Sequence, residues 1–155
     1  MKIGITFGGY CPMHQGHLDL IMRAKKENDI CYVVVCGYDN EPRANETGLT
    51  LNRRFTLVKQ MFKDDEQIKV IQVNDTKLGI DESMSESNWD IWLSYVMEET
   101  LMCGRNPLDN VTWYVGERSY VDALIKRKTS KSSFIHEVVY INRAPNNISA
   151  TMIRE

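Results

Sequence analysis

The sequence predicts an α/β protein in which an open parallel sheet of about five strands is covered by helices on both faces. Two observations support this fold class. Short runs of β-branched and aromatic residues alternate along the chain with segments whose apolar residues recur at helical spacing. One such run, Cys31 to Gly37, is almost continuously apolar, which is typical of a strand buried on both faces.

The N-terminal part is predicted to form a strand, a turn and a helix. Lys2 to Phe7 is the first predicted strand, and the residues from Gly8 to His17 lead through a glycine-containing turn. The helix after the turn is indicated by the spacing of Leu18, Ile21, Met22 and Lys25, flanked by Leu20 and Ala24. Cys31 to Gly37 is the second strand, and the polar residues 38 to 50 are predicted to be a loop.

The remaining elements continue this alternation. Further helices are predicted from the spacing of Leu51, Phe55, Val58 and Phe62, from that of Trp89, Trp92, Leu93 and Val96, and over Ser119 to Lys126. The later strands are Gln67 to Val73, Val111 to Gly116 and Glu137 to Ile141. Residues 74 to 88 are polar and are expected to be a loop that is mobile over the site. The result is a Rossmann-like sheet, which binds ligands beyond the carboxyl ends of its strands.

Length and composition fit one globular domain. The chain has 155 residues, 43% of them hydrophobic, and its formal net charge of −2 gives no electrostatic footprint for nucleic acid. The short basic cluster Lys126 to Lys128, with Lys131, is expected to be a solvated helix end or loop. We find no apolar signal segment or membrane-length run, and the four cysteines form no C-x-x-C pair. These observations predict a cytoplasmic protein with reduced thiols.

The turn after the first strand places two histidines, His14 and His17, at the start of a helix. Backbone N–H groups in the first helical turn lack internal partners and the helix dipole is positive there, so anions bind at this position. Three residues apart, the histidines can face the same anion, and Gly16 lets a ligand approach the backbone. The competing interpretations are cap or surface histidines and a metal site, for which the third histidine, His136, lies far along the chain.

A second phosphate-binding helix end is predicted late in the sequence. Ser149 is a good N-cap residue, Thr151 offers a hydroxyl in the first turn, and Arg154 lies about one turn further on. The alternative is a capped helix with a solvated arginine.

Two more segments are candidates for ligand binding. Trp89 follows a polar loop and Trp92 lies one turn later, so at least one of them can present a flat face to an aromatic ligand ring. Packing in the core is the alternative for both. Gly116 and Glu117 end the fourth predicted strand and so face the same crevice as the first turn, although a surface turn fits them equally well.

Together these motifs resemble the signature of the HxGH nucleotidyltransferase superfamily. Gly8 to His17 matches the pattern G-x-Y-x-P-x-H-x-G-H, and Ile148 to Arg154 is similar to the superfamily's second motif. Pro12 together with His14 favours pyridine-nucleotide adenylyltransferases, because phosphopantetheine adenylyltransferases usually lack this histidine and cytidylyltransferases usually lack the proline. The likeness is closest to the nicotinamide-nucleotide adenylyltransferase domain of NadR-type bifunctional proteins. It includes Thr50 to Phe55, the tryptophan pair and Arg143.

The resemblance implies an enzyme that transfers AMP from ATP to nicotinamide mononucleotide, giving NAD and pyrophosphate. The catalytic residues would be His17 on the α-phosphate, His14 on the triphosphate and Arg154 on the leaving pyrophosphate. ATP and its phosphates would be bound by Phe7, Gly8, Gly9, Tyr10, Gly16, Gly116, Glu117, Arg143, Ser149 and Thr151, and the mononucleotide by Trp89 and Trp92. Mg²⁺ is expected to bind through ATP phosphates and water, with no metal site built from protein ligands.

Several alternatives stay open. The acceptor could be nicotinate mononucleotide, phosphopantetheine or an alcohol phosphate that takes CMP, and a nucleotide sensor without useful turnover is a different class of function. The expected partners are small molecules, without nucleic acid or membrane, and a homo-oligomer is open. Residues 1–155 are expected to be a single nucleotidyltransferase domain, with a kinase domain following in the bifunctional family. The G-x-x-x-x-G-K-[ST] loop of such a kinase does not occur in this sequence.

Overall fold

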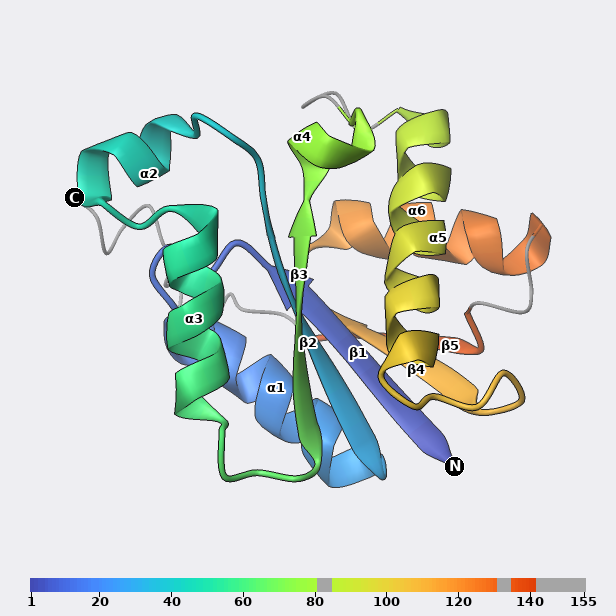
Figure 1. The fold of residues 1–155 in the computed structure, drawn as a ribbon. Helices are drawn as coiled ribbons and strands as arrows, with labels where there is room; N and C mark the ends of the chain where they lie inside the picture. Colours follow the sequence, from blue (N-terminus) through green and yellow to red (C-terminus); the bar gives the residue numbers. More distant parts are fainter. Residues whose placement is uncertain (81–84, 131–134, 142–155) are drawn as a thin grey trace.

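The computed structural model describes residues 1–80, 85–130 and 135–141, and it confirms the predicted α/β fold class. The strands of the described part are β1 (Lys2–Gly8), β2 (Ile30–Gly37), β3 (Ile68–Asn74), β4 (Asn110–Val115) and β5 (Glu137–Tyr140). They form one sheet in the order β3-β2-β1-β4-β5, and each neighbouring pair is parallel (Figure 1).

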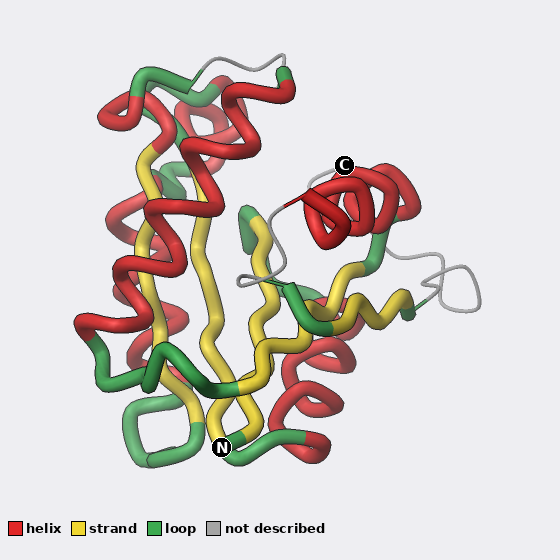
Figure 2. The backbone as a smooth tube through the Cα atoms, turned by 90° about the vertical axis from the view of Figure 1, so that its right-hand side faces the viewer, coloured by secondary structure: helices red, strands yellow, loops and turns green. Residues whose placement is uncertain are grey.

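Helices cover both faces of this sheet, as Figure 2 shows. They are α1 (Gln15–Glu27), α2 (Pro42–Thr47), α3 (Leu51–Met61), α4 (Asp75–Leu78), α5 (Glu86–Met102) and α6 (Arg118–Ser130). Buried side chains of α1 and α3 pack on one face in one apolar cluster. Those of α5 and α6 pack on the other face in a second cluster. The fold is therefore a three-layer sandwich with a core on each side of the sheet.

Strand β2 shows why the apolar run in the sequence predicts two cores. Its side chains alternate, so that Cys31, Val33 and Val35 join the cluster beneath α1 and α3. Tyr32 and Val34 point the other way and join the cluster beneath α5. All five are at most 1% exposed. A central parallel strand buried on both faces needs apolar residues at every position, which is the pattern observed.

The two predicted loops were each wrong in part. Residues 38 to 50 contain α2, which starts with Pro42 in its first turn and ends at Gly48 in the left-handed conformation, φ 73°. Residues 74 to 88 contain the short helix α4, capped by the side chain of Asn74, and the first turn of α5. These helices are short and face solvent, so their sequences are polar and show no apolar spacing. Their capping residues were the available sequence signal.

The buried face of α1 is rotated by part of a turn from the face that the sequence predicted. Leu20, Ile21 and Ala24 are buried, whereas Met22 is 43% exposed. The flanking positions of the predicted stripe are thus its buried centre. The helix α6 also extends past the predicted end at Lys126 to Ser130.

The carboxyl ends of the parallel strands meet along one edge of the sheet, where the chain order reverses at β1. From β1 the chain passes to β2 and β3 on one side and later returns to β4 on the other side (Figure 1). Crevices at such a reversal are the usual ligand sites of open α/β sheets. All four cysteines lie in the described part, and none of them is joined in a disulfide. No helix among the described residues is both long and apolar enough to cross a membrane.

Candidate functional site

The turn between β1 and α1 brings the chain from the sheet edge to a helix N-terminus. After Gly8 the backbone passes through Tyr10 at φ 50° and a cis peptide bond between Cys11 and Pro12. It then reaches His14, which is the N-cap residue of α1. The predicted strand, turn and helix are therefore in the expected order, with the two histidines at the helix mouth.

The two histidines cap α1 reciprocally. His14 Nδ1 accepts a hydrogen bond from the backbone N–H of Gly16 at 3.1 Å, and His17 Nδ1 accepts one from the backbone N–H of His14 at 3.2 Å. This arrangement is a capping box in which imidazole nitrogens replace the usual oxygen atoms. The interpretation of these residues as helix caps was therefore correct, and it does not exclude ligand binding. The amide of Gly16 is occupied by the cap.

The cap fixes how each imidazole can act. A ring whose Nδ1 accepts a backbone N–H carries its proton on Nε2 when it is neutral. Both rings are thus hydrogen-bond donors through Nε2. The rings of His14 and His17 stack with centroids 3.8 Å apart and planes 22° apart, and the residues are only 6% and 8% exposed. Two parallel donors are held rigidly at the positive end of a helix dipole.

Tyr10 packs against the ring of His17. Its ring meets the ring of His17 edge-on at 4.7 Å, and the residue is 4% exposed. A side chain at Gly8 would lie 3.3 Å from the Tyr10 ring and 3.7 Å from the Cδ2 atom of His17. The Tyr10 side chain is thus packed in the wall, and Gly8 is the position where the strand end meets both rings.

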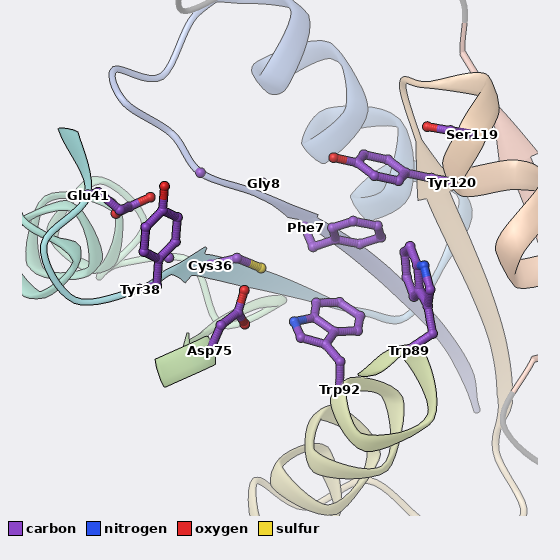
Figure 3. Close-up of a pocket in the computed structure, with 12 residues that line it drawn as sticks. Phe7, Gly8, Cys36, Tyr38, Glu41, Asp75, Trp89, Trp92, Ser119 and Tyr120 are labelled. Carbon is purple, nitrogen blue, oxygen red and sulfur yellow. The ribbon is translucent and has the colours of Figure 1, made fainter. Parts of the chain in front are cut away.

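A cavity of about 450 Å³ opens beside the end of β1, a size in the range of small-molecule sites (Figure 3). Its walls come from the ends of β1 and β2 and from residues of α4, α5 and α6. They are formed by Phe7, Gly8, Gly9, Cys36, Gly37, Tyr38, Glu41, Asp75, Trp89, Trp92, Ser119 and Tyr120. Five of the predicted site residues are among them: Phe7, Gly8, Gly9, Trp89 and Trp92.

Aromatic rings form one side of this cavity. Phe7 lies at the centre, with ring centroids 4.9 Å from Trp92, 5.1 Å from Tyr120 and 6.4 Å from Trp89. Trp92 also contacts Trp113 in the core at 6.0 Å. The core-packing interpretation of the tryptophans is therefore correct, because each is at most 9% exposed. Both also line the cavity, and stacking on a ligand ring stays a prediction.

Arg127 holds Trp89 in place and corrects the expectation of a solvated basic cluster. The residue is 4% exposed, and its Nε donates to the carboxylate of Asp90 at 3.1 Å. Its guanidinium lies 5.9 Å from the Trp89 ring centroid, within cation–π range. The arginine is therefore part of the scaffold of the aromatic wall.

Sequence reasoning missed a buried ion pair between Arg54 and Glu41. Both side chains are 1% exposed, and Arg54 Nη2 donates to the carboxylate of Glu41. Arg54 Nη1 donates to the carbonyl oxygens of Gly9 at 2.7 Å and Cys36 at 3.2 Å. The guanidinium thus ties the ends of β1 and β2 together. A Cβ atom at Gly37 would lie 2.7 Å from Arg54 Nη2, so a larger residue there would have to displace the buried ion pair.

Asp75, also missed, lies in the cavity wall at the start of α4. Its Oδ1 atom is buried and has no hydrogen-bond partner among the described residues. Burial, with a smaller contribution from nearby Glu41, raises the pKa of this carboxyl from 3.8 to about 6. Burial likewise raises the pKa of the neighbouring Cys36 thiol, with Asp75 adding to the shift. A single aspartate in a polar segment carried no sequence signal that separates it from a loop residue.

Gly116 and Glu117, predicted to face the crevice, do not line the cavity. Gly116 follows β4 directly, and the carbonyl of Glu117 accepts hydrogen bonds from the first turn of α6. Ser119 and Tyr120 line the cavity in their place. Arg143, Ser149, Thr151 and Arg154 lie outside the described residues. Among the residues that are described, no group of three or more His, Cys, Asp or Glu side chains could hold a metal ion.

Comparison with known proteins places the chain among nucleotidyltransferases. A family model described as cytidylyltransferase-like matches residues 5–155. The trifunctional NAD biosynthesis/regulator protein NadR of Salmonella typhimurium is 30% identical over 98 residues, which cover 59% of this chain and 23% of that protein. A probable nicotinate-nucleotide adenylyltransferase of Clostridium acetobutylicum is 25% identical, with all of this chain and 86% of that protein covered.

A solved structure agrees with these matches. The crystal structure of a NadR protein in complex with NAD and AMP-PNP superposes with a TM-score of 0.79 and 35% identity. The match covers 99% of this chain and 41% of the solved one. The chain therefore spans about a quarter of the curated NadR protein and two fifths of the solved NadR chain.

Proposed function

Because the chain belongs to the cytidylyltransferase-like family of nucleotidyltransferases, we propose that it transfers AMP from ATP to nicotinamide mononucleotide, giving NAD and pyrophosphate. The observation that carries the proposal is the stacked pair His14 and His17 at the N-terminus of α1, beside an aromatic cavity. The likeness to a NadR structure that contains NAD and AMP-PNP supports the same reaction. We also propose that residues 1–155 form a single nucleotidyltransferase domain.

The reaction needs two anions to be brought together. An oxygen of the mononucleotide 5′-phosphate attacks the α-phosphorus of ATP, the bond from that phosphorus to the bridging oxygen breaks, and pyrophosphate leaves. The nucleophile is already ionised, so positioning and charge stabilisation account for the catalysis. The Nε2–H groups of His17 and His14 would donate to the α-phosphate and to the triphosphate, next to the positive end of α1.

The aromatic lining of the cavity supports a pyridine nucleotide as the acceptor. Its aromatic side offers the faces or edges of Phe7, Trp89 and Trp92 to a flat ring. The backbone at Gly8 and Gly9 connects this cavity to the histidine pair, so a mononucleotide bound there would extend its phosphate toward the helix mouth. Neither glycine has a side chain that would stand in the way of such a ligand.

The remaining assignments follow the motifs. Gly116 and Glu117 would lie near the adenosine, and Arg143, Ser149, Thr151 and Arg154 would hold the β- and γ-phosphates. Mg²⁺ would enter bound to the phosphates of ATP, where it would offset part of their charge.

An acceptor panel tests the proposal. Purified protein with ATP and Mg²⁺ is given nicotinamide mononucleotide, nicotinate mononucleotide or phosphopantetheine, and pyrophosphate and the dinucleotide product are measured. NAD is the expected product, with the highest kcat/KM for nicotinamide mononucleotide. Preferred turnover of phosphopantetheine, or nucleotide binding without any turnover, would contradict the proposal.

A further inference from the structure

Asp75 differs from the other polar groups of the cavity in having an unmet hydrogen-bonding demand. Its Oδ1 atom is buried in the cavity wall and has no partner in the described part of the chain. A buried carboxylate oxygen without a donor is costly and is rarely retained without a reason. The position therefore fits a ligand that brings an N–H or O–H group.

The charges of the cavity wall disfavour a negatively charged ligand group next to Asp75. Glu41, the other carboxylate of the wall, is neutralised by Arg54. That guanidinium also donates to Gly9, Cys36 and Leu49, so its donors are already used by acceptors of the protein. No described residue that lines the cavity is a lysine, arginine or histidine. Among the described residues of the wall, Asp75 is therefore the carboxylate without an ion-pair partner.

Figure 3 shows where this charge lies relative to the aromatic rings. The carboxyl of Asp75 extends into the cavity on the side of Cys36 and Trp92, away from Tyr120 and Ser119. A pyridine ring that packs on the tryptophans and extends its ribose toward the helix mouth has room for its substituent on that side. The substituent, not the ribose or phosphate, would then meet the carboxylate.

We propose that Asp75 determines which acceptor is used: its carboxylate accepts a hydrogen bond from the carboxamide of nicotinamide mononucleotide and repels the carboxylate of nicotinate mononucleotide. This inference rests on the proposed function. The two acceptors differ only in this substituent, so like-charge repulsion acts as a specificity device. Two charges a few ångströms apart in a partly buried cavity produce a preference of about tenfold or more.

The test compares kcat/KM for the two mononucleotides in the wild-type protein, Asp75→Asn and Asp64→Asn. Asparagine removes the charge of Asp75 but keeps its shape. Asp64 is an exposed residue between α3 and β3, so its variant controls for net charge. The wild type and Asp64→Asn are expected to share a preference for nicotinamide mononucleotide, and Asp75→Asn is expected to lose it by about tenfold or more.

The outcomes separate this inference from the proposed function. If the wild type adenylylates neither mononucleotide, the proposed function itself is wrong. If it adenylylates both and Asp75→Asn changes them equally, or if the wild type prefers nicotinate mononucleotide, Asp75 is not the selector.

A second measurement needs no variant. The wild-type preference should fall as the pH drops below about 6, where Asp75 takes up a proton. The acceptor phosphate titrates equally in both substrates and cancels in the ratio. The other titratable groups that face Asp75 are Cys36 from β2 and Glu41 and Tyr38 from the segment after it. A preference that is constant from pH 8 to pH 5 would overturn the inference.

Discussion

His14 combines two duties that a substitution can separate. Its Nδ1 caps α1 through Gly16, and its buried Nε2 is the ring nitrogen left to donate to a ligand. Alanine removes both groups, whereas asparagine is a strong N-cap residue without the imidazole donor. Catalysis and stability should therefore respond differently to the two variants.

We expect His14→Ala to lower the free energy of unfolding by about 1 kcal/mol and His14→Asn to restore most of that loss. Both variants should form NAD much more slowly than the wild type, because neither has a ring N–H. Urea unfolding and steady-state kinetics on the same samples measure the two effects. Recovery of turnover along with stability in His14→Asn would show that the histidine acts only as a cap.

Asp75 is expected to reduce stability at neutral pH. Its pKa is raised to about 6, so the folded state favours the protonated form, and this contribution to stability is fully present below about pH 4. It is lost as the pH rises through about 6. Asp75→Asn should therefore raise the free energy of unfolding by about 1 to 2 kcal/mol at pH 7.5 and leave it nearly unchanged at pH 4. Urea denaturation at both pH values checks this, and an equal effect at both would contradict the shift.

Residues in distinctive motifs could be singled out from the sequence, whereas residues whose importance depends on their three-dimensional neighbours were missed. His14, His17, Gly8 and the tryptophans stand in patterns that local chemistry explains. Arg54 occupies the buried stripe of α3 between Leu51 and Val58, at helical spacing, and that position was the available signal. Asp75 had none, because its role depends on walls contributed by residues distant in sequence.

An arginine of helix α3 joins the ends of two strands through hydrogen bonds. Arg54 reaches from α3 to carbonyls at the ends of β1 and β2 and to Glu41 before α2. Removing one partner of a buried ion pair leaves the other charge uncompensated, which is far more costly than removing both.

Arg54→Met should consequently lower the free energy of unfolding by about 3 kcal/mol or more. The double variant Arg54→Met with Glu41→Leu should regain part of that loss, since no buried charge remains. Chemical denaturation of the two single variants, the double variant and the wild type measures this coupling. Additive losses would show that the pair is not coupled.

Helices and strands with a clear periodicity of apolar residues were predicted well, whereas the short helices α2 and α4 were not. The strands and the helices α1, α3, α5 and α6 follow from apolar spacing, with ends displaced by a few residues. The helices α2 and α4 bury few side chains, so spacing could not indicate them. Their stops at Gly48 and Gly79, both at positive φ, were the readable signs.

At the scale of the whole molecule, the candidate site lies where the strand order reverses. The end of β1 brings the histidine pair of α1 together with an aromatic wall from α5 and α6, although these segments are far apart in sequence. The fold class and the edge that holds the site could be predicted from alternation and motif position. The depth and charge of the cavity could not, because they depend on tertiary packing.

His17 allows the most direct test that this arrangement catalyses adenylyl transfer. NAD formation from ATP, Mg²⁺ and nicotinamide mononucleotide should be measured for the wild type, His17→Ala and His17→Gln. Glutamine at this position can still cap the backbone N–H of His14, so it controls for stability. Both variants are expected to stay folded and to lose about 100-fold or more in kcat. Near-normal turnover in either folded variant would contradict a catalytic role for the histidine pair.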